Sequence, residues 1–510
     1  MPNIKRKPFT PAAEEEEDPA DYDTHFVPPA GWTEADVDQY LQPLSPSAVD
    51  FAALRSQQQA NEEILANEPT LVKVEDILDP HISLWDAIMR EAQRRCIIEW
   101  EKHTPLYAAS LGAQIASQFS LTSCGHAEYG DPPVHEQNKR CLRHGKAPIL
   151  TSVDGGMIRD LRLHVMIVGP PGSGKGTLPL MFLDPGSGIV PQNLFPAKYL
   201  GKMTDAGLFG TVKENAKDPH NPKRSFGLAY KYCSGFIGAE EFNLVKGAAK
   251  AQNINMNLED RLLVFLDRGV VETDLASGSY SYSSGATLWA GNQSDRLWFG
   301  SGESGLSRRV VCDYVHVTEA LNSRLKDAAR QRARIGSVGR VREHIGQRLR
   351  YVIDNFNVHD IRSTPEYESL LNEFGLGEQS DYWGTVHYEE HLLNKIAVGY
   401  NILRYWDPSM TVLPLRVDDA LRAILLRQVG IRESLFASRS LIDFELIQRL
   451  TTHGTAGISR EALLREMRRL GGYDPTKVER ELDSAARSGR VMLRGTGWSQ
   501  VVSLPEDAPL

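Results

Sequence analysis

The chain has 510 residues, of which 41% are hydrophobic, so it is long enough for about two to four domains. Its formal net charge of -9 excludes a uniformly basic nucleic-acid-binding protein, although a local basic patch is compatible with it. No apolar run reaches the ~18 residues of a membrane span, so we expect no membrane partner. The five cysteines do not form a disulfide framework, and no hydrophobic stretch follows the basic residues at the N-terminus. Both features predict a reducing, cytoplasmic compartment.

The first 144 residues divide into a polar tail and a helical region. Residues 1–70 hold the acidic run Glu14–Asp18, many prolines and little apolar periodicity, which predicts a disordered segment. Such a tail serves either as a partner contact or as a solvated linker. In residues 71–144, the amphipathic patterns SLWDAIMREAQRRCIIEWEKH and PLYAASLGAQIASQFSL predict two helices, before a loop that contains glycine, proline and histidine.

The next segment, from residue 145, has the pattern of an α/β domain. Up to residue 315, apolar strand candidates alternate with helical or loop stretches, which predicts a parallel sheet with crossover helices. The strand candidates are LRLHVMIVG, SGFIGAEEF, GATLWAGN and RRVVCDYVHV. Residues 316–440 are predicted to be mainly helical.

Residues 441–504 form a compact C-terminal unit in the sequence pattern. LIDFELIQRLTTHG predicts one helix, Ser459 is suited to cap a second, and Asp474 with Pro475 starts a third. The segment RVMLRGTGWSQVVSL then predicts a β-hairpin that turns at Gly495–Gly497. Three helices and a hairpin in this order predict a winged-helix domain.

A glycine-rich loop, GPPGSGKGT, follows the first strand candidate. Its residues are Gly169, Pro170, Pro171, Gly172, Ser173, Gly174, Lys175, Gly176 and Thr177. The glycines allow backbone N–H groups to converge on phosphate oxygens, and Lys175 would neutralise the β and γ phosphates of ATP. The usual motif places a Mg²⁺-binding hydroxyl directly after the lysine. Because Gly176 stands there, Thr177 is the candidate metal ligand. An ordinary glycine turn is the competing interpretation.

Polar residues end two further strand candidates. Glu240 and Glu241 follow an apolar strand that begins near Phe236. One carboxylate there can hold Mg²⁺ while its neighbour polarises the attacking water, and we assign these roles to Glu240 and Glu241 in that order. Asn292 ends the next strand candidate and can orient the same water. The competing interpretations are a solvated sheet edge for the glutamates and a turn-forming residue for Asn292.

Two arginines, Arg308 and Arg309, stand at the start of the last strand candidate. In ring ATPases, a guanidinium from one subunit stabilises the transition-state charge on the γ-phosphate of its neighbour. Either arginine is a candidate for this role. A surface salt bridge is the alternative for either arginine.

These elements occur in the order of AAA+ ATPases, and the sequence around them resembles the minichromosome maintenance (MCM) branch of replicative helicases. The matching segments are TDAGLFGTV, GLAYKYCSGFIGAEEF, LLVFLDRGVVE, ATLWAGNQ and LSRRVVCDYV, within roughly residues 160–315. The resemblance implies a P-loop AAA+ core with a helical lid at 145–425. It also implies an ATPase that uses Mg²⁺ and forms a homohexamer or other ring, which unwinds or translocates DNA in replication. The family roles carry over to Lys175, Glu240, Glu241, Asn292 and Arg308.

Two segments bear on DNA contact. The insertion KENAKDPHNPKRSFG falls where the family has a pore-directed insert, and it either contacts DNA phosphates or forms a solvated charged loop. Its basic residues are Lys213, Lys217, Lys223 and Arg224. A family hairpin usually presents a lysine to DNA, but no Lys or Arg lies from Gly269 to Asp295, and Tyr280 takes the matching position. Tyr280 and Tyr282 either stack on bases or pack within the protein.

The lid and the N-terminal region also depart from the family. The position of a second phosphate-sensing arginine corresponds to His387, with Lys395 further along the chain. Residues 1–144 are shorter than, and different from, the family's N-terminal DNA-binding region. A compact plasmid- or virus-borne member of the family would fit this shorter and different N-terminal region.

A zinc site is a further hypothesis. Cys124, His126, Cys141 and His144 offer two thiols and two imidazoles, which are ligand types that zinc prefers. Their CxH…CxxH spacing is uncommon, so buried thiols and loop histidines are the alternative.

Two other functions compete with a DNA motor. A AAA+ remodeller of a protein partner, like chelatase or chaperone ATPases, is favoured by the acidic net charge and by the hairpin without basic residues. A small-nucleotide kinase is suggested by GPPGSGKGT, which resembles the loop of adenylate kinases. Those kinases carry the loop at the chain start, whereas here it begins at Gly169 and three further ATPase elements follow.

Overall fold

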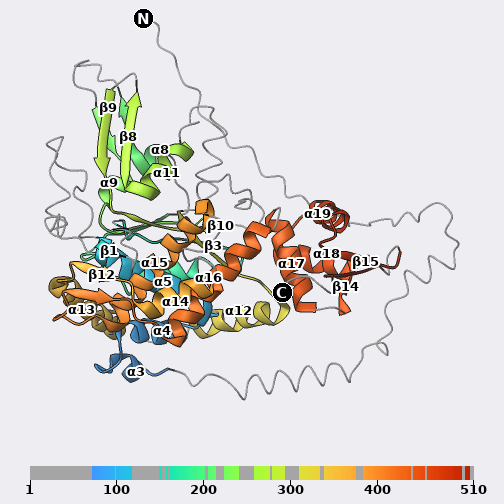
Figure 1. Cartoon of the computed structure of the whole chain (residues 1–510), viewed down its shortest axis with the longest axis horizontal. Coiled ribbons are helices and arrows are strands. Elements are labelled where there is room, and N and C mark those ends of the chain that lie inside the picture. Colours follow the sequence, from blue (N-terminus) through green and yellow to red (C-terminus); the bar gives the residue numbers. More distant parts are fainter. Residues whose placement is uncertain are drawn as a thin grey trace, which may run out of the picture. The chain divides into compact units, whose positions relative to one another are not determined.

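The structure of the protein is a computed structural model (Figure 1). It describes residues 72–97, 99–117, 149–151, 157–158, 160–200, 205–213, 223–240, 258–275, 278–292, 309–332, 338–374, 383–437, 440–453, 456–496 and 500–505. The predicted tail at 1–70 lies outside these residues. No helix in the described part of the chain is long and apolar enough to cross a membrane.

A five-stranded sheet forms the centre of the fold, in the order β11-β3-β10-β7-β4. Its strands are β3 (His164–Val168), β4 (Ala197–Leu200), β7 (Phe236–Ala239), β10 (Thr287–Asn292) and β11 (Val310–Tyr314). All neighbouring pairs are parallel, which confirms the predicted α/β fold with a parallel sheet. The short strand β4 was not among the predicted strands, because it spans only AKYL and carries a lysine in its middle.

Side chains alternate between the two faces of this sheet, and each face packs into its own hydrophobic core. Val165, Ile167 and Trp289 belong to one core, whereas Met166 and Val168 belong to the other. The first core includes α5 (Trp100–Ser117) and α7 (Thr177–Leu183), and the second includes α8 (Asp205–Phe209), α9 (Leu228–Lys231) and α11 (Leu258–Arg268). The two helix layers therefore bury the central strands on both faces, which explains their nearly continuous apolar sequences.

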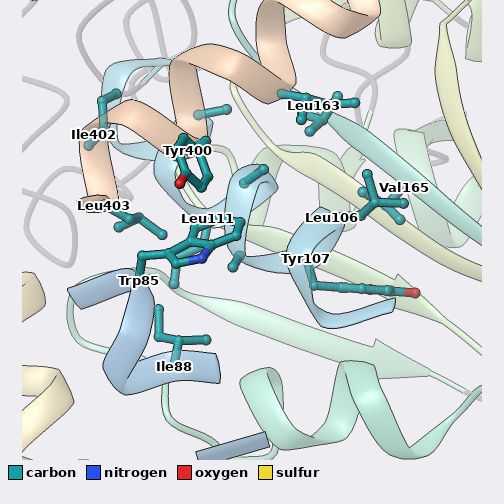
Figure 2. Close-up of a cluster of buried hydrophobic side chains, with 14 of the residues drawn as sticks. Trp85, Ile88, Leu106, Tyr107, Leu111, Leu163, Val165, Tyr400, Ile402 and Leu403 are labelled. Carbon is teal, nitrogen blue, oxygen red and sulfur yellow. The ribbon is translucent and has the colours of Figure 1, made fainter. Parts of the chain in front are cut away.

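The N-terminal helices share the first core with helices from much later in the chain. They are α3 (Val74–Leu78), α4 (Leu84–Arg94) and α5, and they pack on α13 (Gly339–Asn355) and α15 (Trp383–Tyr405). Trp85 meets Tyr400 edge to face, with ring centroids 4.6 Å apart (Figure 2). Helices α5 and α15 approach so closely that a Cβ on Gly399 would lie 1.8 Å from the carbonyl oxygen of Ala109. Residues 72–117 are thus part of the main core.

Smaller sheets and helices complete this part of the protein. Two antiparallel hairpins are β5 (Gly210–Lys213) with β6 (Lys223–Phe226), and β8 (Val270–Leu275) with β9 (Gly278–Ser283). A four-stranded sheet contains β1 (Ile149–Thr151), β2 (Met157–Ile158), β12 (Asp360–Arg362) and β13 (Val412–Pro414). The remaining helices are α12 (Glu319–Arg332), α14 (Pro365–Glu373) and α16 (Asp419–Ala437).

The C-terminal residues form three helices and a small antiparallel sheet. The helices are α17 (Leu441–His453), α18 (Arg460–Gly471) and α19 (Pro475–Arg487), and the strands are β14 (Ile458–Ser459), β15 (Met492–Arg494) and β16 (Val501–Ser503). Ser459 accepts a hydrogen bond from the N–H of Ala462, and Asp474 caps α19 in the same way. The three helices and the small sheet enclose a hydrophobic core of their own, whereas Phe444 of α17 belongs to the second core of the central sheet and packs edge to face on Tyr314.

Candidate nucleotide site

The predicted phosphate loop and two of the predicted polar positions meet at one edge of the central sheet. Strand β10 lies between β3 and β7. In this register Asn292 pairs with Val168, the last residue before the loop, and Ala290 pairs with Ala239, the last residue before Glu240. Ligands of open parallel sheets bind outside the carboxyl ends of the strands. The sheet therefore brings the loop, Asn292 and Glu240 to an edge that is suited to ligand binding.

The loop has a conformation that depends on its glycines. Gly172 and Gly174 have φ angles of 75° and 81°, which lie in the left-handed region that residues with a Cβ rarely adopt. A Cβ on Gly169 would lie 2.9 Å from the hydroxyl oxygen of Ser173. The ammonium group of Lys175 donates to the carbonyl oxygen of Pro170, at 3.1 Å. Helix α7 begins directly after the loop, at Thr177.

Buried polar atoms without hydrogen-bond partners gather around this loop. In the described part of the chain, neither amide atom of Asn292 has a partner, and the side chain is 0% exposed. The hydroxyl oxygens of Ser173 and Tyr199 are also buried and unpartnered among the described residues. Each such group costs about 1–3 kcal/mol when it stays unpaired. Ser173 lies in the loop, the Tyr199 hydroxyl lies beside Gly176, and the backbone of Asn292 bonds that of Gly169, so these groups fit the binding of a polar ligand at the loop.

The acidic residue Glu240 follows strand β7, which pairs with β10. Glu240 is exposed, and its backbone N–H donates to the carbonyl oxygen of Leu200 at 2.8 Å. A Cβ on Gly291 would lie 2.5 Å from the carbonyl oxygen of Glu240, so only glycine lets the two strands meet in this way. An exposed carboxylate at this edge fits a Mg²⁺ ligand. Glu241, the predicted base, lies outside the described residues.

The predicted metal ligand Thr177 lines a pocket together with the loop residues Ser173 and Lys175. His103 and Val315 also line this pocket. Val315 follows β11, which flanks β3 on the side away from β10, β7 and β4. Thr177 thus shares a pocket with Lys175, and Glu240 is not among the residues that line it.

The same pocket reveals a polar cluster that the motifs did not indicate. His103 Nδ1 lies 2.6 Å from one carboxylate oxygen of Asp313, and Arg427 donates to the other oxygen at 2.7 Å. Burial lowers the pKa of His103, but the charge and hydrogen bond of Asp313 outweigh burial and raise it overall. The three residues come from α5, β11 and α16. Their separation along the chain left no local signal.

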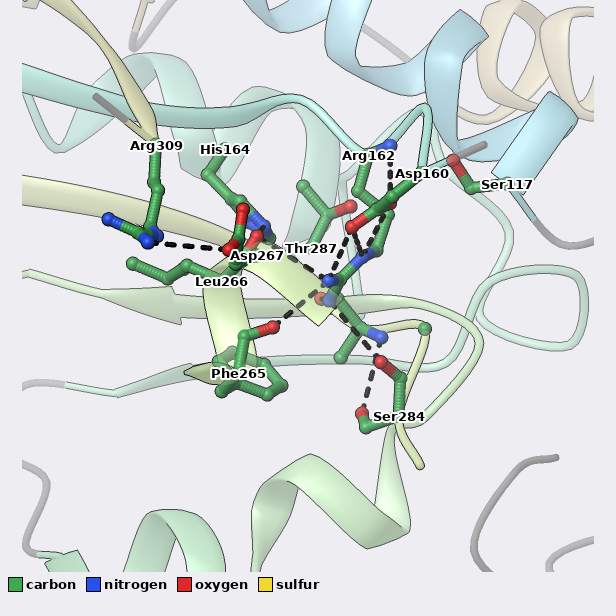
Figure 3. Close-up of polar contacts among 12 residues, drawn as sticks. Ser117, Asp160, Arg162, His164, Phe265, Leu266, Asp267, Ser284, Thr287 and Arg309 are labelled. Atoms are coloured by element: carbon green, nitrogen blue, oxygen red, sulfur yellow. Dashed lines mark hydrogen bonds and ion pairs between the residues drawn. The ribbon is translucent and has the colours of Figure 1, made fainter. Parts of the chain in front are cut away.

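Arg309, the second residue of the arginine pair, lies at the opposite edge of the sheet. Val310, the first residue of β11, pairs with His164, the first residue of β3. Arg309 precedes this pair, and a nitrogen of its guanidinium lies 3.3 Å from a carboxylate oxygen of Asp267 (Figure 3). Arg309 therefore forms a salt bridge, the alternative that the sequence left open for either arginine. Arg308 lies outside the described residues. An arginine that precedes β11 cannot readily reach a phosphate held at the carboxyl edge of its own sheet.

Lys395 also belongs to that opposite edge. Burial lowers its pKa, and the charges that act on it are those of Asp160, Arg162 and Asp267. Arg162 precedes β3, is fully buried, and donates to Asp160 and to backbone carbonyls near the end of α11 (Figure 3). The side chain of His387 lies outside the described part of the structure.

The segments predicted to meet DNA are two hairpins. Tyr282 is buried and donates its hydroxyl to the carbonyl oxygen of Phe209 at 2.9 Å, so it packs within the protein. Tyr280 pairs with Thr273 in the same hairpin. The basic residues Lys213, Lys223 and Arg224 lie on β5 and β6, whereas Lys217 lies outside the described residues.

The four candidate zinc ligands Cys124, His126, Cys141 and His144 fall outside the described residues. Within the described ranges, no group of three or more His, Cys, Asp or Glu is arranged to hold a metal ion. Mg²⁺ at the loop would need oxygens from the nucleotide and water as well, as this ion normally does.

The chain matches no protein-family model, and it matches no curated protein. The fold and the site therefore define a class only: an α/β protein with a glycine-rich loop at the carboxyl edge of a parallel sheet.

Proposed function

We propose that this protein is an ATP-hydrolysing AAA+ motor that acts on DNA, a ring-forming MCM-like helicase or translocase in replication. The observation that carries the proposal is the glycine loop at the carboxyl edge of the parallel sheet, with the unpartnered buried polar atoms of Ser173 and Asn292 at it. A phosphate chain supplies many oxygens that can accept hydrogen bonds, and loops with this conformation bind such anions through backbone N–H groups.

The chemistry follows from the order of the strand ends. The loop amides and Lys175 would hold the phosphates, and Glu240 would hold Mg²⁺, which when bound neutralises phosphate charge. Asn292 lies between the loop and the acidic strand end, so its amide is suited to orient a water. Glu241 would take a proton from that water. The water oxygen would attack the γ-phosphorus while the bond between this phosphorus and the ADP oxygen breaks.

A ring explains why an arginine stands at the wrong edge for its own nucleotide. Residues before β11 lie at the amino edge of the sheet, whereas the loop lies at the carboxyl edge. If subunits pack edge to edge, Arg308 of one subunit reaches the γ-phosphate of the next. That arrangement makes hydrolysis depend on assembly.

The DNA assignment rests on two features outside the nucleotide site. The hairpin β5–β6 carries Lys213, Lys223 and Arg224, residue types that bind DNA phosphates. The three C-terminal helices and the three-stranded sheet are compatible with the proposed winged helix, and the helices between residues 316 and 425 with the proposed lid.

A AAA+ remodeller of a protein partner is the second candidate. It is favoured by the burial of Tyr282, which removes one proposed base-stacking residue from the hairpin without basic residues. Both candidates share the ATPase site and differ in the partner that stimulates it.

The test is ATP hydrolysis by the full chain with and without single-stranded DNA, on protein whose mass is measured in the presence of nucleotide. We expect hydrolysis, stimulation by DNA and the mass of a ring. Lys175→Ala should abolish hydrolysis, and Glu241→Gln should bind ATP but hydrolyse it at least ~100-fold more slowly. Wild-type turnover by Lys175→Ala would end the ATPase assignment. ATPase activity that DNA leaves unchanged and a protein partner stimulates would favour the remodeller.

A further inference from the structure

Tyr199 on β4 has a buried hydroxyl beside the phosphate loop that no sequence motif indicated. In the described structure, this oxygen has no hydrogen-bond partner. Its neighbour in the loop is Gly176, because a Cβ built on Gly176 would lie 3.7 Å from the Tyr199 hydroxyl oxygen. The hydroxyl therefore stands where a side chain on residue 176 would point.

The sheet holds the tyrosine ring in this place. Tyr199 pairs with Gly238 of β7, and a Cβ on Gly238 would lie 2.2 Å from Cδ2 of the ring. The ring thus fills the space that a side chain on Gly238 would need. Since side chains alternate along a strand, Glu240 leaves β7 on the same face as Gly238. Tyr199, Gly176 and Glu240 consequently share one face of the sheet at the loop.

The charge around the tyrosine keeps its proton in place. Burial, together with the negative charge of Glu240, raises the pKa of Tyr199. A phenol with a raised pKa is protonated at neutral pH and can donate a hydrogen bond. Glu240 is thus near enough to act on this group electrostatically.

The loop itself lacks a hydroxyl at the position where phosphate loops normally have one. The usual motif has Ser or Thr directly after the lysine, and that hydroxyl binds Mg²⁺. Here the position is Gly176, and Thr177 lines a pocket together with Lys175, His103 and Val315, the residue after β11. Strand β4 lies at the other end of the sheet from β11. Gly176 has no hydroxyl, so on the face shared with Glu240 the hydroxyl beside the loop is that of Tyr199.

We propose that the Tyr199 hydroxyl replaces the missing loop hydroxyl and donates a hydrogen bond to a water in the coordination shell of the Mg²⁺ bound with ATP. Tyr199 is then a positioning residue, which fixes the metal relative to Glu240 without binding it directly. Mg²⁺ usually keeps several waters, so an outer donor has a partner to orient. The assignment rests on the proposed ATPase function.

The experiment compares metal binding in full-length variants. The probe is Mn²⁺, measured by electron paramagnetic resonance on the complex with a non-hydrolysable ATP analogue. Tyr199→Phe keeps the ring on Gly238 and removes only the hydroxyl. It should weaken Mn²⁺ binding by ~10–100-fold, the usual effect of losing an outer-shell partner, and leave metal-free binding of the analogue unchanged.

Two further variants separate positioning from a structural effect. Tyr282→Phe removes a hydroxyl that donates to the Phe209 carbonyl oxygen in the other core, and it should leave the Mn²⁺ affinity as in the wild type. Gly176→Ser in the Tyr199→Phe background should restore much of the affinity. Serine is compatible with the φ of -73° and ψ of -21° at residue 176.

The outcomes distinguish this role from the ATPase assignment itself. A wild-type protein that binds no ATP analogue overturns both. Analogue binding with equal Mn²⁺ affinity in wild type and Tyr199→Phe overturns the role of Tyr199 alone. Equal losses in Tyr199→Phe and Tyr282→Phe overturn it as well, because the effect would then be structural.

Discussion

Replacing Asn292 by leucine should make the nucleotide-free protein more stable and its ATPase slower. Asn292 is 0% exposed, and neither its amide nitrogen nor its amide oxygen has a partner among the described residues. An unpaired buried polar group costs about 1–3 kcal/mol, and leucine has nearly the same shape without that cost. The free energy of unfolding should therefore rise by about 1–3 kcal/mol.

Asn401 on α15 is the matched control. It is also 0% exposed, but its amide nitrogen donates to the carbonyl oxygens of Ala397 and Arg416, and its amide oxygen accepts from the N–H of Arg416. Asn401→Leu removes the side-chain partner of the Arg416 N–H and carbonyl groups and should lower the free energy of unfolding by about 1–3 kcal/mol. Urea unfolding without nucleotide measures both variants, and the two shifts should have opposite signs.

The activity of Asn292→Leu completes the prediction. A polar group placed at the reacting centre is typically worth ~10²–10³ in rate, so hydrolysis should fall by about that factor while ATP still binds. If Asn292→Leu destabilises the free protein as Asn401→Leu does, the amide is a structural group and the reasoning from its unpaired atoms is refuted. Unchanged hydrolysis would remove Asn292 from the reaction.

Three other perturbations test the ring, a buried acid and the helix packing. A mixture of Arg308→Ala and Lys175→Ala proteins should hydrolyse ATP faster than either variant alone, since an arginine finger typically raises the rate by ~10³ or more. Mixed rings without activity would exclude that Arg308 acts in trans. Burial raises the pKa of Glu445 from 4.5 to about 7, so the native state holds a proton that the unfolded chain releases between these values. The free energy of unfolding should consequently fall as pH rises through that window, and Glu445→Gln should flatten the slope in urea unfolding; an unchanged slope would contradict it. Gly399→Ala places a Cβ 1.8 Å from a backbone oxygen of α5 and should destabilise the folded protein by ~3 kcal/mol or more. Gly430→Ala, in open space on α16, should stabilise the folded protein by about 1 kcal/mol. Thermal unfolding of both variants tests this difference in sign.

Local features of the chain were predictable because neighbouring residues determine them. The apolar strands β3, β7, β10 and β11 were expected from their sequences, and the caps Ser459 and Asp474 act where they were predicted. A lysine after glycines, or an acid at a strand end, is visible in a short window. The sequence by itself therefore determined the α/β class and the candidate loop.

Only the tertiary structure decided which strands are neighbours and which side chains meet. Nothing local places β10 between β3 and β7, and this order is what brings Asn292 between the loop and Glu240. The short strand β4 escaped prediction, and with it Tyr199, whose place depends on the missing side chain of Gly238. His103 and Asp313 meet across 210 positions of sequence. Such contacts follow from how two sheet faces bury their apolar residues against helices, and that packing depends on the whole chain at once.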